Sequence, residues 1–372
     1  MIKLIEQKFE DQFDQLYYSM NHTDERRKKV IHLNEEKDRK IARIKKTTNK
    51  VVTEYMKVYQ LNNVFYYYQE LMSKDNSLKS YSKDLLCEDE RQHLLKTARK
   101  TFSSNKYELE DLAPLLYLQH LLYGIKDEWK AKNVVIDEGQ DYSLFQLYAL
   151  RKSTGTDLFT ILGDLSQGIH SYRGMKSWNQ LIEEVFPRAL YRTLKKSYRT
   201  TIEIMNLANS LLSYSMPHLD SAEPVVRHGE SPFFRRAENK KDAKQHLMKA
   251  LEHVRNLNFK TIAIISKTNE EAKRIEKMGL SLTDYVFQRL EENVSIESRK
   301  IAIVPAHLSK GLEFDAVIIM NLAEPYRDEE LDTKLLYVAM TRPLHHLQLI
   351  APSKETVLLN RIDQSYYNEN LE

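Results

Sequence analysis

Carboxylates directly follow a short apolar run in "VVIDEGQDYS", residues 134–143. Residues 134–136 are β-branched and predict a buried strand, after which come Asp137, Glu138 and Asp141. Mg²⁺ prefers oxygen ligands and usually takes one or two carboxylates plus substrate phosphates, so we expect Asp137 to ligate Mg²⁺. Glu138 would then be free to activate a water that attacks a phosphate. The alternatives are acids that merely cap a strand-to-helix turn, and a metal-dependent nuclease built on Asp137 and Asp141.

Four further segments that could contact a nucleotide follow in order along the chain. In "GDLSQGIHSYRG", residues 163–174, Gln167 can hydrogen-bond a phosphate or its attacking water. "LKKSYRT" places an aromatic ring beside an arginine. In "HLSKGLEFD" a glycine lets the backbone approach a ligand, and Glu313 can accept a hydrogen bond from a sugar hydroxyl. "LLYVAMTRP" predicts a helix that presents Thr341 and Arg342 near its end.

Short β-branched runs alternate with helical patterns after Trp129. Strands separated by helices predict a parallel sheet covered on both faces, with ligand sites at the carboxyl ends of the strands. Asp137 and Asp164 both stand at such ends. We expect strands at 133–138, 158–164, 261–266, 300–306, 315–322 and 346–352, and helices at 201–213, 242–256 and 332–342.

The first 125 residues have helical patterning, with no glycine before Gly124. Their most basic stretch, from Arg26 to Lys50, holds eleven Lys or Arg and three acids. One reading is the solvated face of a long helix or helical hairpin, and the other is an arm that touches nucleic acid or an acidic partner.

Length and composition set broad limits on the protein. A chain of 372 residues with a net charge of +3 predicts two or three domains and permits nucleic-acid binding without arguing for it. Its single cysteine, Cys87, excludes a disulfide framework and is expected to be an inert, buried or half-buried thiol. No apolar run reaches the ~20 residues of a membrane span, so we expect a soluble, cytoplasmic protein. The adjacent His345 and His346 do not predict a metal pair, because neighbouring side chains point in different directions.

From about 105 to 352, the motif series resembles UvrD/Rep-type superfamily 1 helicases in residue identity, order and approximate spacing. The resemblance implies ATP and Mg²⁺ as cofactors and single-stranded or duplex DNA as a partner. It also implies that Arg199 reaches the γ-phosphate and that Arg342 is a second arginine finger, a role that can contribute ~10³ to 10⁵ in rate. The resemblance also implies that Asp137 is a magnesium ligand, Glu138 the catalytic base and Gln167 a sensor of the γ-phosphate. It further implies that Tyr198 stacks on the adenine and that Gly311 and Glu313 line the nucleotide.

The implied fold is α/β, with RecA-like parallel-sheet motor domains preceded by an all-helical insertion region. We expect a helical insertion or arm at 1–125, the C-terminal part of a first motor domain at 126–189, a near-complete second motor domain at 190–352 and a tail at 353–372. ATP would close the cleft between the motor domains, and hydrolysis would open it.

One required part of such a motor has no match in the chain. The phosphate-binding loop G-x-x-x-x-G-K-[ST] (Walker A) needs a glycine followed by a lysine. The sequence has nine glycines, and none of them is followed by a lysine. Gly163 and Gly168 have the right gap but continue with Ile169 and His170. We therefore expect the C-terminal part of a longer motor, which hydrolyses ATP only together with a missing Walker A segment.

Two features favour the HelD group, which resembles UvrD motors but acts on bacterial RNA polymerase. Only 111 residues separate Thr200 from Gly311, too few for the large inserted domain of ordinary UvrD motors. The segment "YELEDLAPLLYLQHLLYG" before the acidic strand also resembles that group. Pro305 stands at a position that is often threonine in UvrD-type helicases, and proline has neither a hydroxyl nor an amide proton for a nucleic-acid phosphate. His170 stands where an aromatic residue is more usual. Both differences weaken the case for a helicase that moves along a nucleic-acid strand. The alternative function is a non-catalytic module that binds nucleic acid or RNA polymerase.

Overall fold

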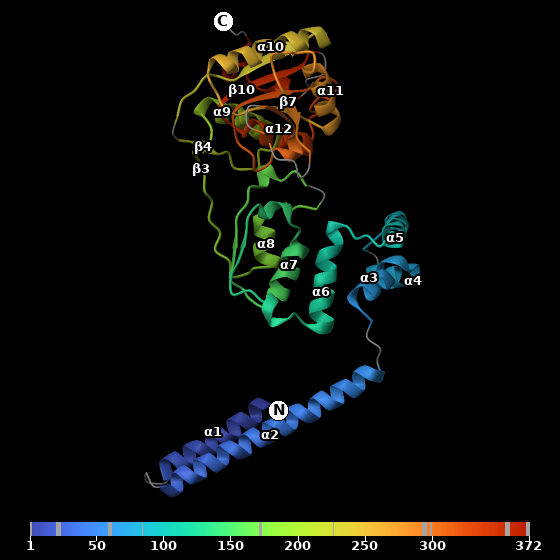
Figure 1. Ribbon diagram of the computed structural model, residues 1–372, viewed down its shortest axis with the longest axis vertical. Coiled ribbons are helices and arrows are strands. Elements are labelled where there is room, and N and C mark those ends of the chain that lie inside the picture. Colours follow the sequence, from blue (N-terminus) through green and yellow to red (C-terminus); the bar gives the residue numbers. More distant parts are fainter. Residues whose placement is uncertain are drawn as a thin grey trace. The chain divides into compact units, whose positions relative to one another are not determined.

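The computed structural model describes residues 2–19, 24–58, 62–83, 85–170, 173–225, 227–291, 296–297, 300–353 and 358–369. The chain divides into two compact units, Met1–Leu118 and Gln119–Glu372 (Figure 1). Within the described ranges, no helix is long and apolar enough to cross a membrane.

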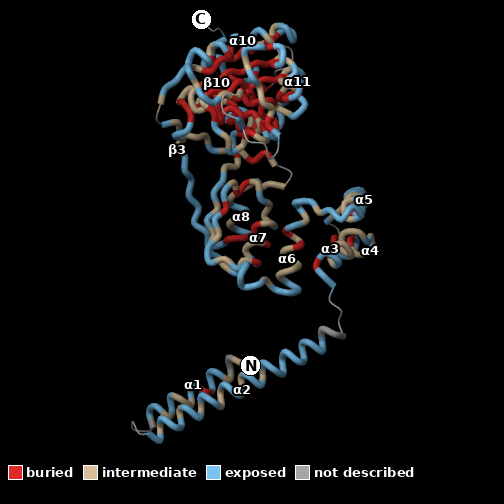
Figure 2. The backbone as a smooth tube through the Cα atoms, viewed as in Figure 1, coloured by how far each residue is buried: buried red, intermediate tan, exposed pale blue. Residues whose placement is uncertain are grey.

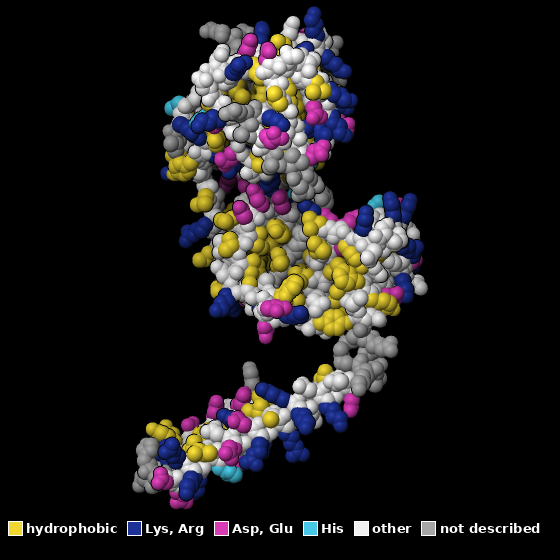
Figure 3. Space-filling view, viewed as in Figure 1, with side chains coloured by type: hydrophobic (Ala, Val, Ile, Leu, Met, Phe, Trp, Pro, Cys, Tyr) yellow, Lys and Arg dark blue, Asp and Glu magenta, His cyan; other side chains and the backbone are white. Residues whose placement is uncertain are grey.

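The first unit is helical, and the part of it that the structure describes contains no strand. Its long helix α2 carries the basic stretch. From residue 24 to 55 the side chains of this helix are exposed or half-buried, with Lys and Arg interspersed among acids (Figures 2 and 3). Surface ion pairs such as Lys40–Glu36, at 2.7 Å, run along it. The predicted helical patterning is therefore confirmed. The helices are α1 Ile2–Ser19, α2 Asp24–Val58, α3 Val64–Ser73, α4 Asp75–Ser82, α5 Glu88–Ser103 and α6 Leu112–Tyr123, the last of which continues into the second unit.

Cys87 differs from its sequence-based expectation. It is exposed rather than buried, because it occupies the N-cap of α5, where its backbone N–H donates to Glu90 Oε2 at 2.9 Å. The acids of the first turn, Glu88, Asp89 and Glu90, are exposed as well, so this end of α5 faces solvent.

The second unit is built on a six-stranded sheet in which every pairing is parallel, in the order β5-β10-β9-β6-β8-β7. Four of these strands were predicted, whereas β5 and β7 were missed because one carries two arginines and the other is three residues long. The bounds are β5 Phe233–Ala237, β6 Ile262–Ser266, β7 Phe287–Arg289, β8 Ile301–Pro305, β9 Phe314–Met320 and β10 Pro343–Pro352.

Helices cover both faces of this sheet, as predicted (Figures 1 and 2). Successive strand residues point to opposite faces, so Ile265 packs with α9 and α12 while Ile264 packs with α10 and α11. This mixed α/β layering is consistent with a RecA-like domain. The helices are α9 Ile202–Ser215, α10 Lys240–Asn256, α11 Asn269–Gly279 and α12 Glu330–Met340. Leu358, Leu359 and Ile362, near the C-terminus, join the core on the α9 side.

A smaller two-stranded sheet lies in the same unit. Strand β1, Val134–Ile136, pairs in parallel with β2, Phe159–Ile161, so Asp137 and the segment before Asp164 leave from the same edge, as expected. Helices α7, Leu144–Thr154, and α8, Trp178–Glu184, complete its core. The side chains of Val135, Leu158 and Leu162 are exposed. A second small pair joins β3, Lys196–Ser197, to β4, Glu223–Pro224.

Two positions on α10 test the packing of this helix on the sheet. Leu251 is fully buried there, while Met248 is exposed. We expect Leu251→Ala to lower the free energy of unfolding by about 2–5 kcal/mol, because it leaves a cavity. Met248→Ala should change it by less than ~0.5 kcal/mol. Urea unfolding followed by circular dichroism measures both, and equal losses would show that α10 does not pack as described.

Candidate nucleotide site

The acidic loop after β1 turns sharply. Glu138 has φ 54° and ψ 39°, a left-handed conformation uncommon for a residue other than glycine. The exposed carboxylate of Asp137 accepts a hydrogen bond from the Glu138 backbone N–H at 2.8 Å. The turn leads into a short 3₁₀ segment, Gly139–Asp141, so that the three acids lie within one loop.

Lys310 pairs with two of these acids. Its Nζ lies 3.1 Å from Glu138 Oε2 and 2.7 Å from Asp141 Oδ2, and its side chain is only 10% exposed. Burial alone would raise the pKa of Glu138, but a hydrogen bond from Gln140 and the charge of Lys310 outweigh it and hold this pKa below its ordinary value. Glu138 is therefore ionised at neutral pH. Lys310 lies within the "HLSKGLEFD" segment, but nothing in the sequence showed that it would meet these carboxylates.

Gln140 is the buried link between the two polar loops of the smaller sheet. Its side-chain amide donates to Glu138 Oε2 and accepts from the Asp164 backbone N–H at 3.0 Å. The backbone carbonyl of Gln140 accepts from the Met175 backbone N–H at 3.1 Å. A Cβ at Gly163 would overlap the Gln140 amide, and one at Gly174 would lie 2.6 Å from its carbonyl oxygen. Both glycines thus allow backbone to approach Gln140 closely. Gln140 stands among the polar residues that follow the predicted strand, but the sequence assigned it no role.

Gln167 connects this loop pair to the end of α12. Its Nε2 donates to Asp164 Oδ2 at 2.7 Å, and its Oε1 accepts from Arg342 Nη2 at 2.8 Å. The second contact joins residues 175 positions apart in the chain. A side chain at the edge of the two-stranded sheet therefore meets one that immediately precedes β10 of the large sheet.

Arg342 is almost fully buried, at 1% exposure. Its guanidinium also donates to the Val338 carbonyl at 2.9 Å, to Thr341 Oγ1 at 3.1 Å and to the Leu312 carbonyl at 3.4 Å. Burial first, and then the charge of Arg199, lower its pKa to about 10, against the opposing influence of nearby carboxylates, namely Glu138, Glu313 and Asp164. Arg342 therefore lies within electrostatic range of three other charged residues proposed from the sequence, namely Arg199, Glu138 and Glu313.

The remaining predicted residues lie nearer the surface. Arg199 Nε pairs with Glu313 Oε1 at 2.8 Å, and both side chains are partly exposed. Tyr198 is 62% exposed, so its ring is open to solvent. Gly311 has φ +78°, a backbone conformation that favours glycine, and a Cβ there would meet no described atom of the chain within 4 Å. Tyr172, in the same segment as Gln167, lies outside the described residues.

The donor set fits a hard divalent cation beside phosphate. Asp137 is exposed, and Asp141 keeps one buried carboxylate oxygen, Oδ1, without a hydrogen-bond partner within the described ranges. Carboxylate oxygens of this kind suit Mg²⁺, which needs only one or two of them alongside substrate phosphates. Arg199, Lys310 and Arg342 supply the positive charge that a triphosphate requires.

The sequence is similar to those of known DNA helicases. The family described as "UvrD-like helicase C-terminal domain" matches residues 300–350, a segment that runs from β8 to β10 and includes Lys310, Gly311, Glu313 and Arg342. A probable DNA helicase of Mycoplasma pneumoniae is 24% identical over 281 residues, which cover 68% of this chain and 50% of that protein. The ATP-dependent DNA helicase Rep of Escherichia coli K12 is 27% identical over 175 residues, covering 45% of this chain and 26% of that protein.

The chain spans half or less of the length of these relatives. A solved C-terminal domain of a possible DNA helicase from Lactobacillus plantarum is 26% identical and covers 47% of this chain and 99% of that domain, with a TM-score of 0.38. The sequence matches support the predicted relationship to UvrD/Rep-type superfamily 1 helicases.

The Lys310 cluster makes a pH-dependent prediction. Because the pKa of Glu138 is depressed in the folded protein, its carboxylate stabilises the fold above the unfolded pKa, and this contribution is lost as the pH falls through the folded pKa. Lys310→Gln should lower stability at pH 7, by less than about 1 kcal/mol because Glu138 is 44% exposed and screened by solvent. The difference from wild type should shrink below about pH 4.

Urea unfolding between pH 3 and pH 7 measures this difference. Lys273→Gln, which removes a surface pair with Glu270, is the matched control and should have a smaller effect at pH 7. A loss for Lys310→Gln that does not vary with pH would contradict the assignment.

Proposed function

We propose that this chain is part of an ATP-dependent, UvrD-like DNA helicase or translocase, with Mg-ATP bound where Glu138, Lys310, Gln167 and Arg342 meet. The supporting observation is the contact between Gln167 and Arg342, together with the two ion pairs of Lys310. These contacts join the acidic loop of the smaller sheet to loops of the larger one. In this proposal 126–189 is part of a first motor domain, 190–352 is a second, 1–125 is a helical arm and 353–372 is a tail.

Each proposed role follows from charge and exposure. Asp137 would hold Mg²⁺, which would neutralise charge on the phosphate oxygens, and Glu138 would accept a proton from the attacking water. Tyr198, whose ring is open to solvent, would stack on the base. Gly311 and Glu313 would line the nucleotide, with Glu313 accepting from the ribose.

The two arginines would act differently. Arg199 pairs with Glu313 at the surface, where such a pair is worth about 0–1 kcal/mol, so a phosphate can draw it away. Arg342 has protein acceptors for each of its guanidinium nitrogens, and each buried donor left unpaired would cost about 1–3 kcal/mol. We therefore assign Arg199 as the mobile finger. Arg342 would stay in place and stabilise phosphate charge from there. Its hydrogen bond to Gln167 would couple the presence of the γ-phosphate to the loop that follows β2.

A segment carrying the Walker A loop is a required partner in this proposal, because no glycine of the 372 residues is followed by lysine. The exposed side chains of Val135, Leu158 and Leu162 on the two-stranded sheet support this requirement. A two-stranded sheet is marginal alone, and a further segment that extends this sheet and packs on its faces would bury these side chains.

The finer part of the proposal is a HelD-like role, with RNA polymerase as a further partner and a cytoplasmic location. The basic, solvated helix α2 supports it, since such a surface suits an acidic partner. A module that binds nucleic acid or polymerase without hydrolysis is the alternative.

Hydrolysis and nucleotide binding test the main proposal separately. The chain alone should turn over Mg-ATP far more slowly than about 1 per second, because the loop amides and lysine are missing. Arg199→Ala should weaken binding of a fluorescent ATP analogue, whereas Arg192→Ala, at an exposed position in the same segment, should not. Motor-rate turnover would refute the requirement for the loop, and equal binding by both variants would refute the site.

A charge reversal tests the arm. Arg39, Arg43 and Lys46 are exposed on α2, and changing all three to Glu should reduce capture of core RNA polymerase in a pull-down. The control reverses three exposed lysines of α10, Lys240, Lys241 and Lys249. Equal capture by the two triple variants would argue against the arm assignment.

A further inference from the structure

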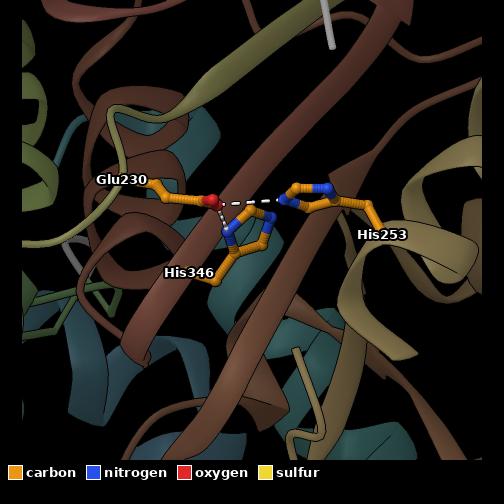
Figure 4. A group of neighbouring side chains, drawn as sticks. All are labelled: Glu230, His253 and His346. Atoms are coloured by element: carbon orange, nitrogen blue, oxygen red, sulfur yellow. Dashed lines mark hydrogen bonds and ion pairs between the residues drawn. The ribbon is translucent and has the colours of Figure 1, made fainter. Parts of the chain in front are cut away.

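Three side chains with metal-binding atoms converge at a place that plays no part in the proposed nucleotide site (Figure 4). Glu230 Oε2 lies 3.0 Å from His253 Nε2 and 3.0 Å from His346 Nδ1. Across the residues that the structure describes, this is the one group of three or more His, Cys, Asp or Glu with ligand atoms mutually within 4.8 Å.

The fold holds these side chains on three different elements. Glu230 precedes β5, His253 is in the last turn of α10, and His346 is in β10, which pairs directly with β5. The ring of Phe233 packs against both imidazoles, with centroid distances of 5.6 Å to His253 and 5.9 Å to His346. The two imidazole rings are themselves 5.1 Å apart. The imidazole positions are therefore set by packing and not by the carboxylate alone.

We propose that Glu230, His253 and His346 bind a divalent transition-metal ion of the zinc type. Two imidazoles and one carboxylate form a ligand set that such ions favour, with a fourth position left for water. Bonds of about 2.0–2.2 Å in tetrahedral geometry place ligand atoms roughly 3.3 Å apart, close to the two observed distances. Glu230 is 45% exposed, so its carboxylate can withdraw slightly to admit the ion between the rings.

Gln348 supports the assignment from behind His346. One end of its amide lies 2.8 Å from His346 Nε2, while its Oε1 is buried with no hydrogen-bond partner in the described part of the chain. Rotating the amide by 180° would let Oε1 accept from the Nε2–H of His346. That tautomer leaves the Nδ1 lone pair directed at the ion, as in metal sites where an outer hydrogen bond orients the histidine.

A cavity gives the ion access. Its volume is about 450 Å³, and Glu230 and His346 line it together with His345, His228 and Asp315. The side chain of His346 is only 2% exposed, whereas that of Glu230 is 45% exposed, so the carboxylate lies on the solvent side of the group. A bound ion would join the segment before β5 to α10 and β10 and would stabilise this side of the large sheet.

Zinc titration of the full chain against a chromophoric chelator tests the proposal. Glu230→Gln and His253→Gln should each lose one tightly bound equivalent relative to wild type. His246→Gln is the matched control, because His246 lies on the same helix outside the group, and it should keep the wild-type stoichiometry. Circular dichroism verifies that each variant is folded. An unchanged stoichiometry in both ligand variants would overturn the site.

A measurement on the wild-type protein does not depend on any variant folding. X-ray absorption at the zinc edge, with one equivalent bound, should show two imidazole nitrogens at about 2.0–2.1 Å. Zinc should also raise the midpoint of thermal unfolding of wild type and of His246→Gln, but not that of His253→Gln. A spectrum without imidazole ligands, or an equal shift in all three proteins, would contradict the proposal.

Discussion

A buried guanidinium constrains the polar side of the second unit. Arg342 is 1% exposed, and its donors are met by two carbonyls, a hydroxyl and the amide of Gln167. Leaving a buried charge without partners costs about 3–5 kcal/mol, so the loop before β9, the end of α12 and the segment after β2 must keep their places together. The acidic loop is held by the same arrangement, because Gln167 bonds Asp164, whose backbone N–H donates to Gln140.

The strands of the large sheet could be predicted where they are continuous apolar runs, as in "TIAIIS" and "DAVIIM", because both faces of such a strand are buried. β5 escaped prediction because Arg235 and Arg236 interrupt its pattern. The motif residues were found by type and order, but Lys310 and Gln140 acquire their partners only through tertiary contacts. Glu230 and His253 are 23 residues apart and His346 is far beyond both, a spacing that matches no metal signature.

Two cations of the site are already paired within the chain as described. Lys310 pairs with two carboxylates and Arg199 with Glu313, so in the proposed function a triphosphate would have to exchange these partners. Breaking an exposed ion pair costs little free energy, whereas breaking a buried one costs much more. An exposed arginine such as Arg199 is therefore suited to move toward a ligand, and a buried one such as Arg342 is suited to stay in place.

The central claim is tested most directly by hydrogen–deuterium exchange with a non-hydrolysable Mg-ATP analogue. The analogue concentration should be on the order of millimolar, so that weak binding is still detected. The account predicts slower exchange at once in three segments distant in sequence, residues 137–141, 196–200 and 309–313, with no change in α10. Exchange that stays the same in all three segments, or slows only elsewhere, would contradict a shared nucleotide site.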